Sequence, residues 1–491
     1  MLKNIKILFA GIVFLLPFHS ARAAKISAYI PAYVSGNVAV IDLPDVLGPV
    51  ISGSAGAQGV SFTPDGAFVY VTNQTTNSVS KIEVSSNTLI ENISVNDGPL
   101  GIAVSPEGDF IYVANLFSNS VDVIDASNDT VIASVSACGV PRGIAFTPDG
   151  AFAYVTCGLD DTVVVINVAT QSLVGAPIVV GASPIGIAMA PDATHAYVTN
   201  VAGNTVSVIN VETQSVDATI SVGNQPIGIV ISPDGSRLYV SNNADDTVSV
   251  MNTSNNTVIG SGLIVGGGPY GISITPDGAT VYVVNSSDAT VSPIDTQSLE
   301  VGTAIDISAS INTPIAFGNF ITPSPVLQLE PETYAFSDQE IGTSSDPVTF
   351  TLRNRGTALL RITDISVSGD FSQTNNCGLT VNSAESCSIF VSFTPSAEGV
   401  REGNISITDN VQNFDNAEIV ASPQVFSLSG TGTATPLPPP PTPTPGALQG
   451  ACSLHVGVND FSNGVLGISV LNLALLWILK KFHDSKTSQK I

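Results

Sequence analysis

The feature that most limits the fold of this chain is a repeat of about 42 residues. Prolines inside a recurring Pro-Asp-Gly-type turn fall at positions 64, 106, 148, 191, 233 and 276, with spacings of 42, 42, 43, 42 and 43 residues. A fixed period of this length is typical of architectures built from repeated units. Each turn is followed by a tyrosine, and a further tyrosine lies near the start of the repeats: Tyr29, Tyr70, Tyr112, Tyr154, Tyr197, Tyr239 and Tyr282.

Each unit predicts four short strands. In residues 226–268, strands are expected at 228–232, 237–241, 247–251 and 258–265, with Pro233-Asp-Gly235 as the turn between the first two. Short Val- and Ile-rich runs separated by Asn, Asp and Gly predict an antiparallel meander. Four strands with a period of 42 indicate one blade of a β-propeller.

The number of units predicts seven blades over residues 24–323. Tyr29-Ile30 corresponds to the second strand of a blade, so the first blade lacks an inner strand of its own. Residues 313–323 repeat the inner-strand pattern after the seventh unit. We expect this segment to return to the first blade and close the ring, because closure removes the free sheet edge.

The repeats resemble those of the YVTN-repeat β-propellers. Tyr70-Val-Thr-Asn73 and Tyr197-Val-Thr-Asn200 match the motif literally. WD40 repeats fit less well, since the only tryptophan is Trp477. The resemblance implies a propeller like those of surface-layer and envelope proteins, with a fold related to sugar lactonases, and says little about activity.

A second domain is expected at residues 326–433, where the period disappears and alternating apolar and polar runs replace it. About 105 residues of this kind predict an immunoglobulin-like β-sandwich. Asn354-Arg-Gly-Thr357, Asn376-Cys-Gly378 and Leu428-Ser-Gly-Thr-Gly432 resemble the bacterial choice-of-anchor D (ASH-type) domain. That resemblance implies a stalk or spacer.

The two ends predict export and anchoring. Residues 1–23 have a basic start, an apolar stretch and a small-x-small site, as in a signal peptide; a membrane anchor is the alternative. Residues 434–446 hold seven prolines and predict an extended linker. In the tail, 447–491, the apolar run Gly464–Leu479 precedes Lys480 and Lys481, which favours a transmembrane helix with a cytosolic end over a buried core helix. The order of cysteine, apolar helix and basic end resembles bacterial C-terminal sorting tails. We therefore expect a cell-envelope protein with its ectodomain outside the cytosol.

Charge and composition exclude several classes of function. Residues 26–479 contain seven basic and 39 acidic residues, a net charge of −32, which would repel a nucleic-acid backbone. Outside the two ends the only histidines are His195 and His455, so a His-rich copper or zinc site is not expected. No Cys-x-x-Cys-His haem motif is present. We predict no cofactor and no metal.

The five cysteines predict two disulfides. Folding the hairpin about Asp149-Gly150 places residue 142 opposite Cys157, and Cys138 lies just upstream, so Cys138–Cys157 is expected, with two buried thiols as the alternative. Cys377 and Cys387 form the second expected pair. Cys452 is left alone beside the apolar tail, where it predicts a processing or lipid-attachment point; an intermolecular disulfide or an idle thiol are the alternatives.

Candidate ligand-binding residues lie where each inner strand begins with Pro-x-Gly. The position x is Leu100, Arg142, Ile185, Ile227 or Tyr270, and these residues should meet at one mouth of the channel. Arg142 could contact an anion or carboxylate, although a salt bridge to a neighbouring Asp is the plainer expectation. Tyr270, Asp97 and Asn224 are further candidates at the rim. The pairs Asp160-Asp161 and Asp245-Asp246 suggest turn chemistry rather than calcium binding.

Two classes of function fit these residues. The first expectation is a non-enzymatic binding or display module, for adhesion or envelope structure, with an extracellular protein or glycan as partner. The alternative is a lactonase-like hydrolase that uses carboxylates and Arg142 at the channel mouth. A set of Glu, Asp and Arg side chains converging on one position would favour the enzyme.

Overall fold

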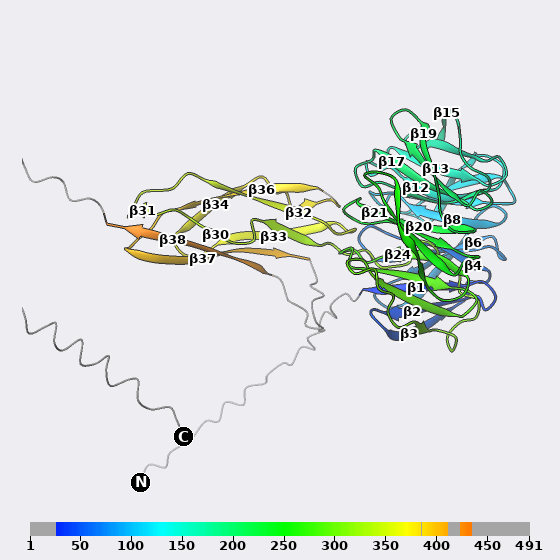
Figure 1. Cartoon of the computed structure of the whole chain (residues 1–491), viewed down its shortest axis with the longest axis horizontal. Helices are drawn as coiled ribbons and strands as arrows, with labels where there is room; N and C mark the ends of the chain where they lie inside the picture. Colours follow the sequence, from blue (N-terminus) through cyan, green and yellow to red (C-terminus); the bar gives the residue numbers. More distant parts are fainter. Residues whose placement is uncertain (1–25, 384, 411–422, 435–491) are drawn as a thin grey trace, which may run out of the picture. The chain divides into compact units, whose positions relative to one another are not determined.

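The structure, a computed structural model, describes residues 26–383, 385–410 and 423–434 and consists of strands (Figure 1). The segment expected to be a signal peptide, most of the expected linker, the apolar tail segment and Cys452 lie outside the described residues. Within the described ranges, no helix long and apolar enough to cross a membrane is found.

Residues 27–318 form seven sheets that correspond to the seven predicted blades. Blade 1 holds β1 (Ser27–Ala32), β2 (Asn37–Asp42) and β3 (Val46–Ser52). Blade 2 holds β4 (Ala57–Phe62), β5 (Phe68–Asn73), β6 (Ser78–Glu83) and β7 (Thr88–Ser94). Blade 3 holds β8 (Pro99–Val104), β9 (Phe110–Asn115), β10 (Ser120–Asp125) and β11 (Thr130–Ser136). Blade 4 holds β12 (Pro141–Phe146), β13 (Phe152–Cys157), β14 (Thr162–Asn167) and β15 (Ser172–Val179).

The remaining blades repeat this order, with each strand antiparallel to the next. Blade 5 holds β16 (Pro184–Met189), β17 (His195–Asn200), β18 (Thr205–Asn210) and β19 (Ser215–Ser221). Blade 6 holds β20 (Pro226–Ile231), β21 (Arg237–Asn242), β22 (Thr247–Asn252) and β23 (Thr257–Ile264). Blade 7 holds β24 (Pro269–Ile274), β25 (Thr280–Asn285), β26 (Thr290–Asp295) and β27 (Ile305–Asp306).

The C-terminal segment of the propeller completes blade 1, as predicted. The amide of Tyr29 donates to the carbonyl of Phe320 at 2.8 Å, and the amide of Ile315 donates to that of Pro31 at 2.8 Å. Within the same segment, β28 (Phe317–Gly318) pairs with β4 of blade 2. The first blade therefore gains an inner strand from the far end of the domain, and the ring closes.

The Thr and Asn of the repeated motif have separate structural roles. Thr199 Oγ1 donates to the carbonyl of Ile227 in the next blade at 2.9 Å, and Thr72, Thr156 and Ser241 make the equivalent bond. The asparagine that follows is buried and donates from Nδ2 to hydroxyls on the third strand of its own blade. This bond is made by Asn73, Asn115, Asn200, Asn242 and Asn285.

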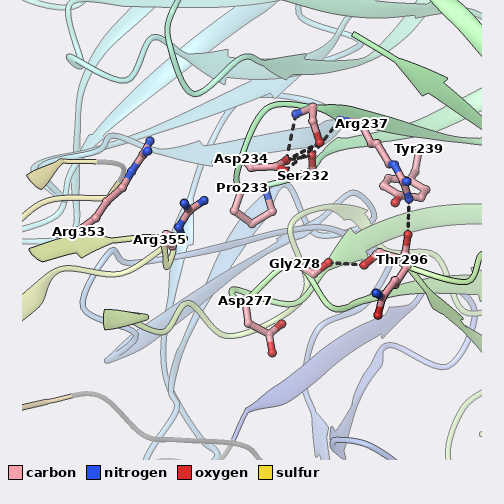
Figure 2. Close-up of a pocket in the computed structure, with 12 residues that line it drawn as sticks. Ser232, Pro233, Asp234, Arg237, Tyr239, Asp277, Gly278, Thr296, Arg353 and Arg355 are labelled. Atoms are coloured by element: carbon pink, nitrogen blue, oxygen red, sulfur yellow. Dashed lines mark hydrogen bonds between the residues drawn. The ribbon is translucent and has the colours of Figure 1, made fainter. Parts of the chain in front are cut away.

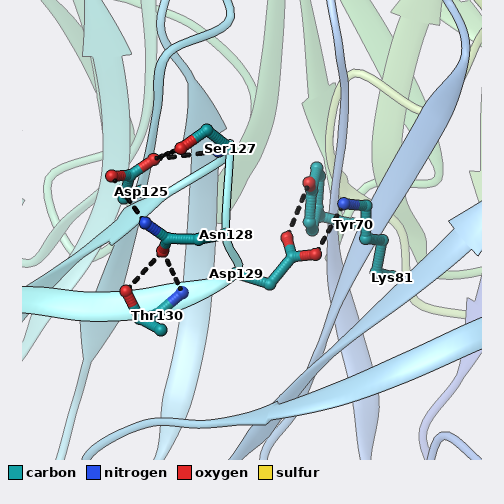
Figure 3. A network of polar contacts seen from close by, with 7 residues as sticks. All are labelled: Tyr70, Lys81, Asp125, Ser127, Asn128, Asp129 and Thr130. Atoms are coloured by element: carbon teal, nitrogen blue, oxygen red, sulfur yellow. Dashed lines mark hydrogen bonds and ion pairs between the residues drawn. The ribbon is translucent and has the colours of Figure 1, made fainter.

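The tyrosines of the motif pack between blades. One of them, Tyr70, donates a hydrogen bond to the carboxylate of a buried ion pair (Figure 3). Lys81 Nζ on β6 lies 2.7 Å from Asp129 Oδ2, in the turn that joins β10 and β11 of the next blade. Tyr70 donates to the other carboxylate oxygen at 3.4 Å, and the Phe68 ring lies 4.5 Å from the ammonium nitrogen. The side chains of Lys81 and Asp129 are only 11 % and 15 % exposed. This contact joins blades 2 and 3 through charge as well as packing.

The predicted disulfide of the propeller, Cys138–Cys157, is present. The register differs from our prediction by one residue, since Pro141 and not Arg142 lies opposite Cys157. The cause is an irregularity between Pro141 and Ile144 that shifts the pairing, and the same shift occurs in the other complete blades.

The second domain is made of two sheets around one apolar core. One sheet holds β29 (Leu327–Glu330), β32 (Val348–Asn354), β36 (Ser386–Phe393) and β34 (Phe371–Asn375). The other holds β30 (Tyr334–Ala335), β31 (Gln339–Glu340), β38 (Gln424–Thr433), β37 (Gly399–Asp409), β33 (Leu360–Val367) and β35 (Thr380–Val381). Phe350 and Phe393 are fully buried between them. The predicted Cys377–Cys387 disulfide is also present.

Candidate functional site

The inner strands bring seven side chains into one ring. In each blade, the residue before the inner-strand glycine belongs to this inner ring, which is made of Gln58, Leu100, Arg142, Ile185, Ile227, Tyr270 and Phe317. The glycines are required because the blades approach so closely: a Cβ at Gly101 would overlap the carbonyl oxygen of Arg142 in the next blade. The equivalent approach recurs from blade 2 to blade 7, so the first six side chains occupy equivalent positions. Gly271 faces the carbonyl oxygen of Ala316 and not that of Phe317, so Phe317 joins the ring through packing and not through the same register.

A pocket of about 340 Å³ lies over part of this ring. Its volume is within the range of small-molecule sites, ~300–1,000 Å³. We call it the channel mouth, and it is lined by Tyr33, Gln58, Gln74, Leu100, Leu116, Arg142, Ile185, Tyr270 and Ile315. Tyr33, Gln74 and Leu116 each directly follow the second strand of their blade, so two positions of the repeat build the pocket.

Arg142 is half-buried at this mouth and is not neutralised by a carboxylate. Its Nη1 donates to Ser183 Oγ at 3.2 Å, and no ion pair within the described residues includes its guanidinium. The expected salt bridge to a neighbouring Asp is therefore not formed. Burial lowers the pKa of Arg142, but a guanidinium titrates so far above pH 7 that it stays charged.

The neighbouring acidic side chains are occupied by loop amides instead. Asp160 Oδ2 accepts from the amide of Gly139 at 2.7 Å, and Asp161 Oδ1 accepts from the amide of Ser183 at 2.7 Å. Asp245 accepts from the amide of Asn224 at 2.6 Å in the same way. These contacts agree with turn chemistry for the acidic pairs. They also hold the carboxylates at the loops, where Arg142 does not reach them.

Tyr270 is the second predicted residue that lines the pocket. Burial raises the pKa of its phenol, and the positive charge of Arg142 opposes that rise. The hydroxyl therefore stays protonated at neutral pH and can donate a hydrogen bond. Arg142 and Tyr270 together present cationic and neutral donors to one small cavity.

The other two predicted rim residues do not line the pocket. Asp97 is exposed in the loop before β8, where its carbonyl accepts bonds from Phe117 and Ser118. Asn224 is exposed and tied to Asp245 at 2.8 Å and to Asn204 at 3.1 Å. Both residues were predicted to lie at the rim of the channel mouth. The structure places them in loops between strands, and neither side chain lines the pocket. The repeat does not determine which neighbouring groups a loop side chain contacts.

Sequence reasoning missed five lining residues: Tyr33, Gln58, Gln74, Leu116 and Ile315. A signal was present for Gln58, since Ala57-Gln-Gly59 takes the place of Pro-x-Gly in blade 2. A second signal was the position directly after strand two, which recurs in every unit.

A second pocket, of about 320 Å³, lies at the turn that joins β20 and β21 (Figure 2). Its propeller side chains are already engaged: Ser232 Oγ donates to Asp234 at 2.5 Å, and the Arg237 guanidinium donates to the carbonyl of Thr296. Thr296 Oγ1 in turn donates to the carbonyl of Gly278 at 2.7 Å. We assign the candidate site to the channel mouth instead, because that pocket brings together the two predicted residues Arg142 and Tyr270.

Comparison with known proteins agrees with the observed fold. A family model described as "Lactonase, 7-bladed beta-propeller" matches residues 24–137 and 131–303. The periplasmic gluconolactonase of Pseudomonas aeruginosa is 19 % identical, with a TM-score of 0.50 over 59 % of this chain and 97 % of that one. A candidate 6-phosphogluconolactonase of Bacteroides uniformis is 16 % identical, with a TM-score of 0.51 over 60 % of this chain and 98 % of that one. At these identities the two structures show the fold alone. No curated protein matches the sequence.

Proposed function

Since this chain belongs to the lactonase family of seven-bladed β-propellers, we propose that it is a lactonase-like hydrolase whose active site is the channel mouth. The observation that carries the proposal is the guanidinium of Arg142, which is half-buried in a pocket of small-molecule size and forms no ion pair with a carboxylate of the described ranges. Such a charge attracts the oxygen that becomes negative when an ester carbonyl is attacked.

The family match corrects our first functional expectation. A non-enzymatic binding or display module was expected from the absence of catalytic motifs, and that expectation is wrong. The match supports the alternative named beside it, the lactonase-like hydrolase. The carboxylates expected to accompany Arg142 are not among the lining residues, so the catalytic groups differ from those predicted.

The proposed reaction is the addition of water to the carbonyl carbon of a cyclic ester. The acyl–oxygen bond of the ring then breaks, the ring oxygen takes a proton, and the product is a hydroxy acid that ionises at neutral pH. Arg142 and the protonated Tyr270 hydroxyl are the donors available to the carbonyl oxygen. Gln58 and Gln74 offer amide groups that can orient the attacking water. Neither a histidine nor a carboxylate lines the described pocket, so the water is activated by the polarised carbonyl rather than by a side-chain base.

The test is lactone hydrolysis by the purified protein, followed through acid release and corrected for the uncatalysed rate. Arg142→Met should lower kcat/KM by about 10²–10³-fold, the loss typical of removing one oxyanion donor. Arg142→Lys should retain part of the rate, because it keeps a charge but loses the planar donor fork. Arg237→Met is the matched control, because Arg237 is the first residue of β21, does not line the channel mouth and donates to the carbonyl of Thr296. A loss below threefold in Arg142→Met, or no hydrolysis of any lactone by the wild type, would overturn the proposal.

The rest of the chain supports a wider proposal about location. We propose that the protein is exported to the cell envelope, that its propeller is of the YVTN-repeat type, and that the second domain is an immunoglobulin-like spacer of the choice-of-anchor D type. The two disulfides support an oxidising compartment. The tail with Cys452 and the apolar run 464–479 would attach the protein to a membrane.

A further inference from the structure

The walls of the channel mouth indicate which class of lactone it takes. Leu100, Ile185, Ile227 and Phe317 of the inner ring form one buried apolar cluster, each less than a tenth exposed. Leu116 and Val201 pack against this cluster from the loops that follow strand two. The pocket itself is therefore lined by aliphatic side chains on blades 1, 3 and 5, namely Ile315, Leu100, Leu116 and Ile185, with the rest of the cluster beside them.

Three large apolar side chains are exposed on the loops that follow the second strands of blades 1, 3 and 4. Val34 follows the lining residue Tyr33 and is 72 % exposed, and Phe117 follows the lining residue Leu116 and is 65 % exposed. Leu159, which is 72 % exposed, follows Gly158, against which the Arg142 guanidinium lies. We call Val34, Phe117 and Leu159 the apolar collar. These large apolar side chains are exposed although acidic residues outnumber basic ones more than fivefold in the ectodomain.

The polar side chains of the mouth include no carboxylate. Arg142 is the only charged side chain among the nine lining residues, and the other polar ones are two glutamines and two tyrosines. A sugar hydroxyl that enters such a pocket loses its bonds to water and finds no carboxylate to accept a strong charge-assisted hydrogen bond in return. A phosphorylated lactone would bring about two negative charges to a single cation. A polyhydroxylated or phosphorylated sugar lactone therefore fits the mouth poorly.

From these three observations we infer that the substrate is a lactone with an aliphatic substituent: its carbonyl faces Arg142 and its hydrocarbon chain lies over Leu100 and Leu116 toward the apolar collar. The inference rests on the proposed function. It makes the aliphatic lining of blades 1, 3 and 5 a specificity-determining surface rather than packing alone.

The experiment compares δ-lactones of increasing side-chain length, δ-valerolactone, δ-octalactone and δ-decalactone, with glucono-1,5-lactone. We expect kcat/KM to rise by up to about fourfold for each added methylene that reaches the apolar surface. Glucono-1,5-lactone should be hydrolysed at least tenfold less efficiently than δ-decalactone. A flat series, or a preference for glucono-1,5-lactone, would overturn the inference and leave the lactonase proposal standing.

Two variants at exposed positions test the collar without disturbing the core. Phe117→Ser and Leu159→Ser should lower the ratio of δ-decalactone to δ-valerolactone hydrolysis. Ile90→Ser is the control, because Ile90 is 53 % exposed on the outer strand β7. An equal fall of the ratio in the control would also count against the collar.

A binding measurement tests the ligand class separately from catalysis. If the wild type hydrolyses no lactone, the proposed function is wrong, but the binding data still show which class of ligand the channel mouth accepts. Calorimetric titration with decanoate and with gluconate compares carboxylates that resemble the two types of product. Binding of decanoate that is lost in Arg142→Met supports the aliphatic class. Tighter binding of gluconate, or binding of neither compound, overturns it.

Discussion

The disulfide of blade 4 occupies a position that asparagine fills in five other blades, and this substitution allows a test of the repeat. Cys157 is the last residue of β13, where other blades end the strand with the buried asparagine that donates to a hydroxyl five residues later. In blade 4 that hydroxyl belongs to Thr162, and among the described residues it has no hydrogen-bond partner. In blade 4 the disulfide therefore takes the place of the hydrogen bond that the asparagine makes in the other blades. The double variants Cys138→Ala/Cys157→Ala and Cys138→Ala/Cys157→Asn separate the two contributions.

Two changes in the free energy of unfolding are expected, one from the loop that the disulfide closes and one from the unsatisfied hydroxyl of Thr162. The disulfide joins cysteines 19 residues apart, so the chain-entropy relation gives a loss of about 3 kcal/mol when it is removed. For a domain of roughly 300 residues this lowers Tm by about 5 °C. In the Asn variant, a bond from the new amide to Thr162 Oγ1 should return about 1 kcal/mol, because it satisfies a buried hydroxyl.

Scanning calorimetry and chemical unfolding of the purified variants would measure both effects. We expect the stability order wild type, then the Asn variant, then the Ala variant. Cys377→Ala/Cys387→Ala is the control, since it removes a disulfide of the second domain and leaves blade 4 intact. If the Asn variant is no more stable than the Ala variant, the two residues are not equivalent in the repeat. If the Ala variant melts with the wild type, the loop-entropy argument is refuted.

Four further predictions concern other parts of the molecule. Lys81→Met should destabilise the propeller by about 3 kcal/mol, since it leaves Asp129 buried without its cation, and Lys81→Met/Asp129→Asn should recover most of that loss in urea unfolding. The hydrogen bond from Arg401, with those from Ser396, lowers the pKa of Asp370 to about 2. The stability that the ionised Asp370 contributes is therefore present above pH 4 and is lost as the pH falls toward 2, and Arg401→Ala should flatten this part of a curve of stability against pH. Lactone hydrolysis should rise with pH from 6 to 9 without a plateau below pH 7, because no Asp, Glu or His lines the described channel mouth, and a bell-shaped profile centred near neutrality would contradict this. Deleting residues 314–322 should expose the edge of β1 and abolish cooperative unfolding of the propeller, whereas an unchanged calorimetric transition would show that closure contributes little.

The propeller could be predicted because its signals are local and repeated. Each Pro-Asp-Gly turn fixes a hairpin, and seven copies of the tyrosine fix the number of blades. The same periodicity predicts that Arg142 and Tyr270 lie in one ring, since both occupy the position between Pro and Gly at the start of an inner strand. The Cys138–Cys157 disulfide was predicted from the hairpin about Asp149-Gly150, and Cys377–Cys387 was predicted because the two cysteines have no other local partner. The one-residue shift at Pro141 was not predicted, because it depends on a bulge for which the sequence carries no signal.

Contacts between blades could not be predicted in the same way. The pairing of Lys81 with Asp129 depends on how blades 2 and 3 are set against each other, and 48 residues separate the two side chains. The missing carboxylate partner of Arg142 has the same origin, because Asp160 and Asp161 turn toward loop amides. An acidic side chain in a loop can accept from any of several nearby donors. The sequence alone therefore does not predict which donor each of the many acidic residues binds.

The closing strand of blade 1 also determines when the ring can become complete. Strands of blades 2 to 7 can pair as soon as each blade's own residues are free to fold, since each of these blades is formed mainly from neighbouring residues. Blade 1 must wait for residues 314–321, which meet β1 only after nearly 300 further residues have been synthesised. Until then β1 presents an unpaired edge, the kind of surface to which chaperones and other nascent chains add a strand. The interval between the release of Ser27 and of Ile321 into the compartment where the chain folds is thus the period in which this chain is most exposed to misassembly.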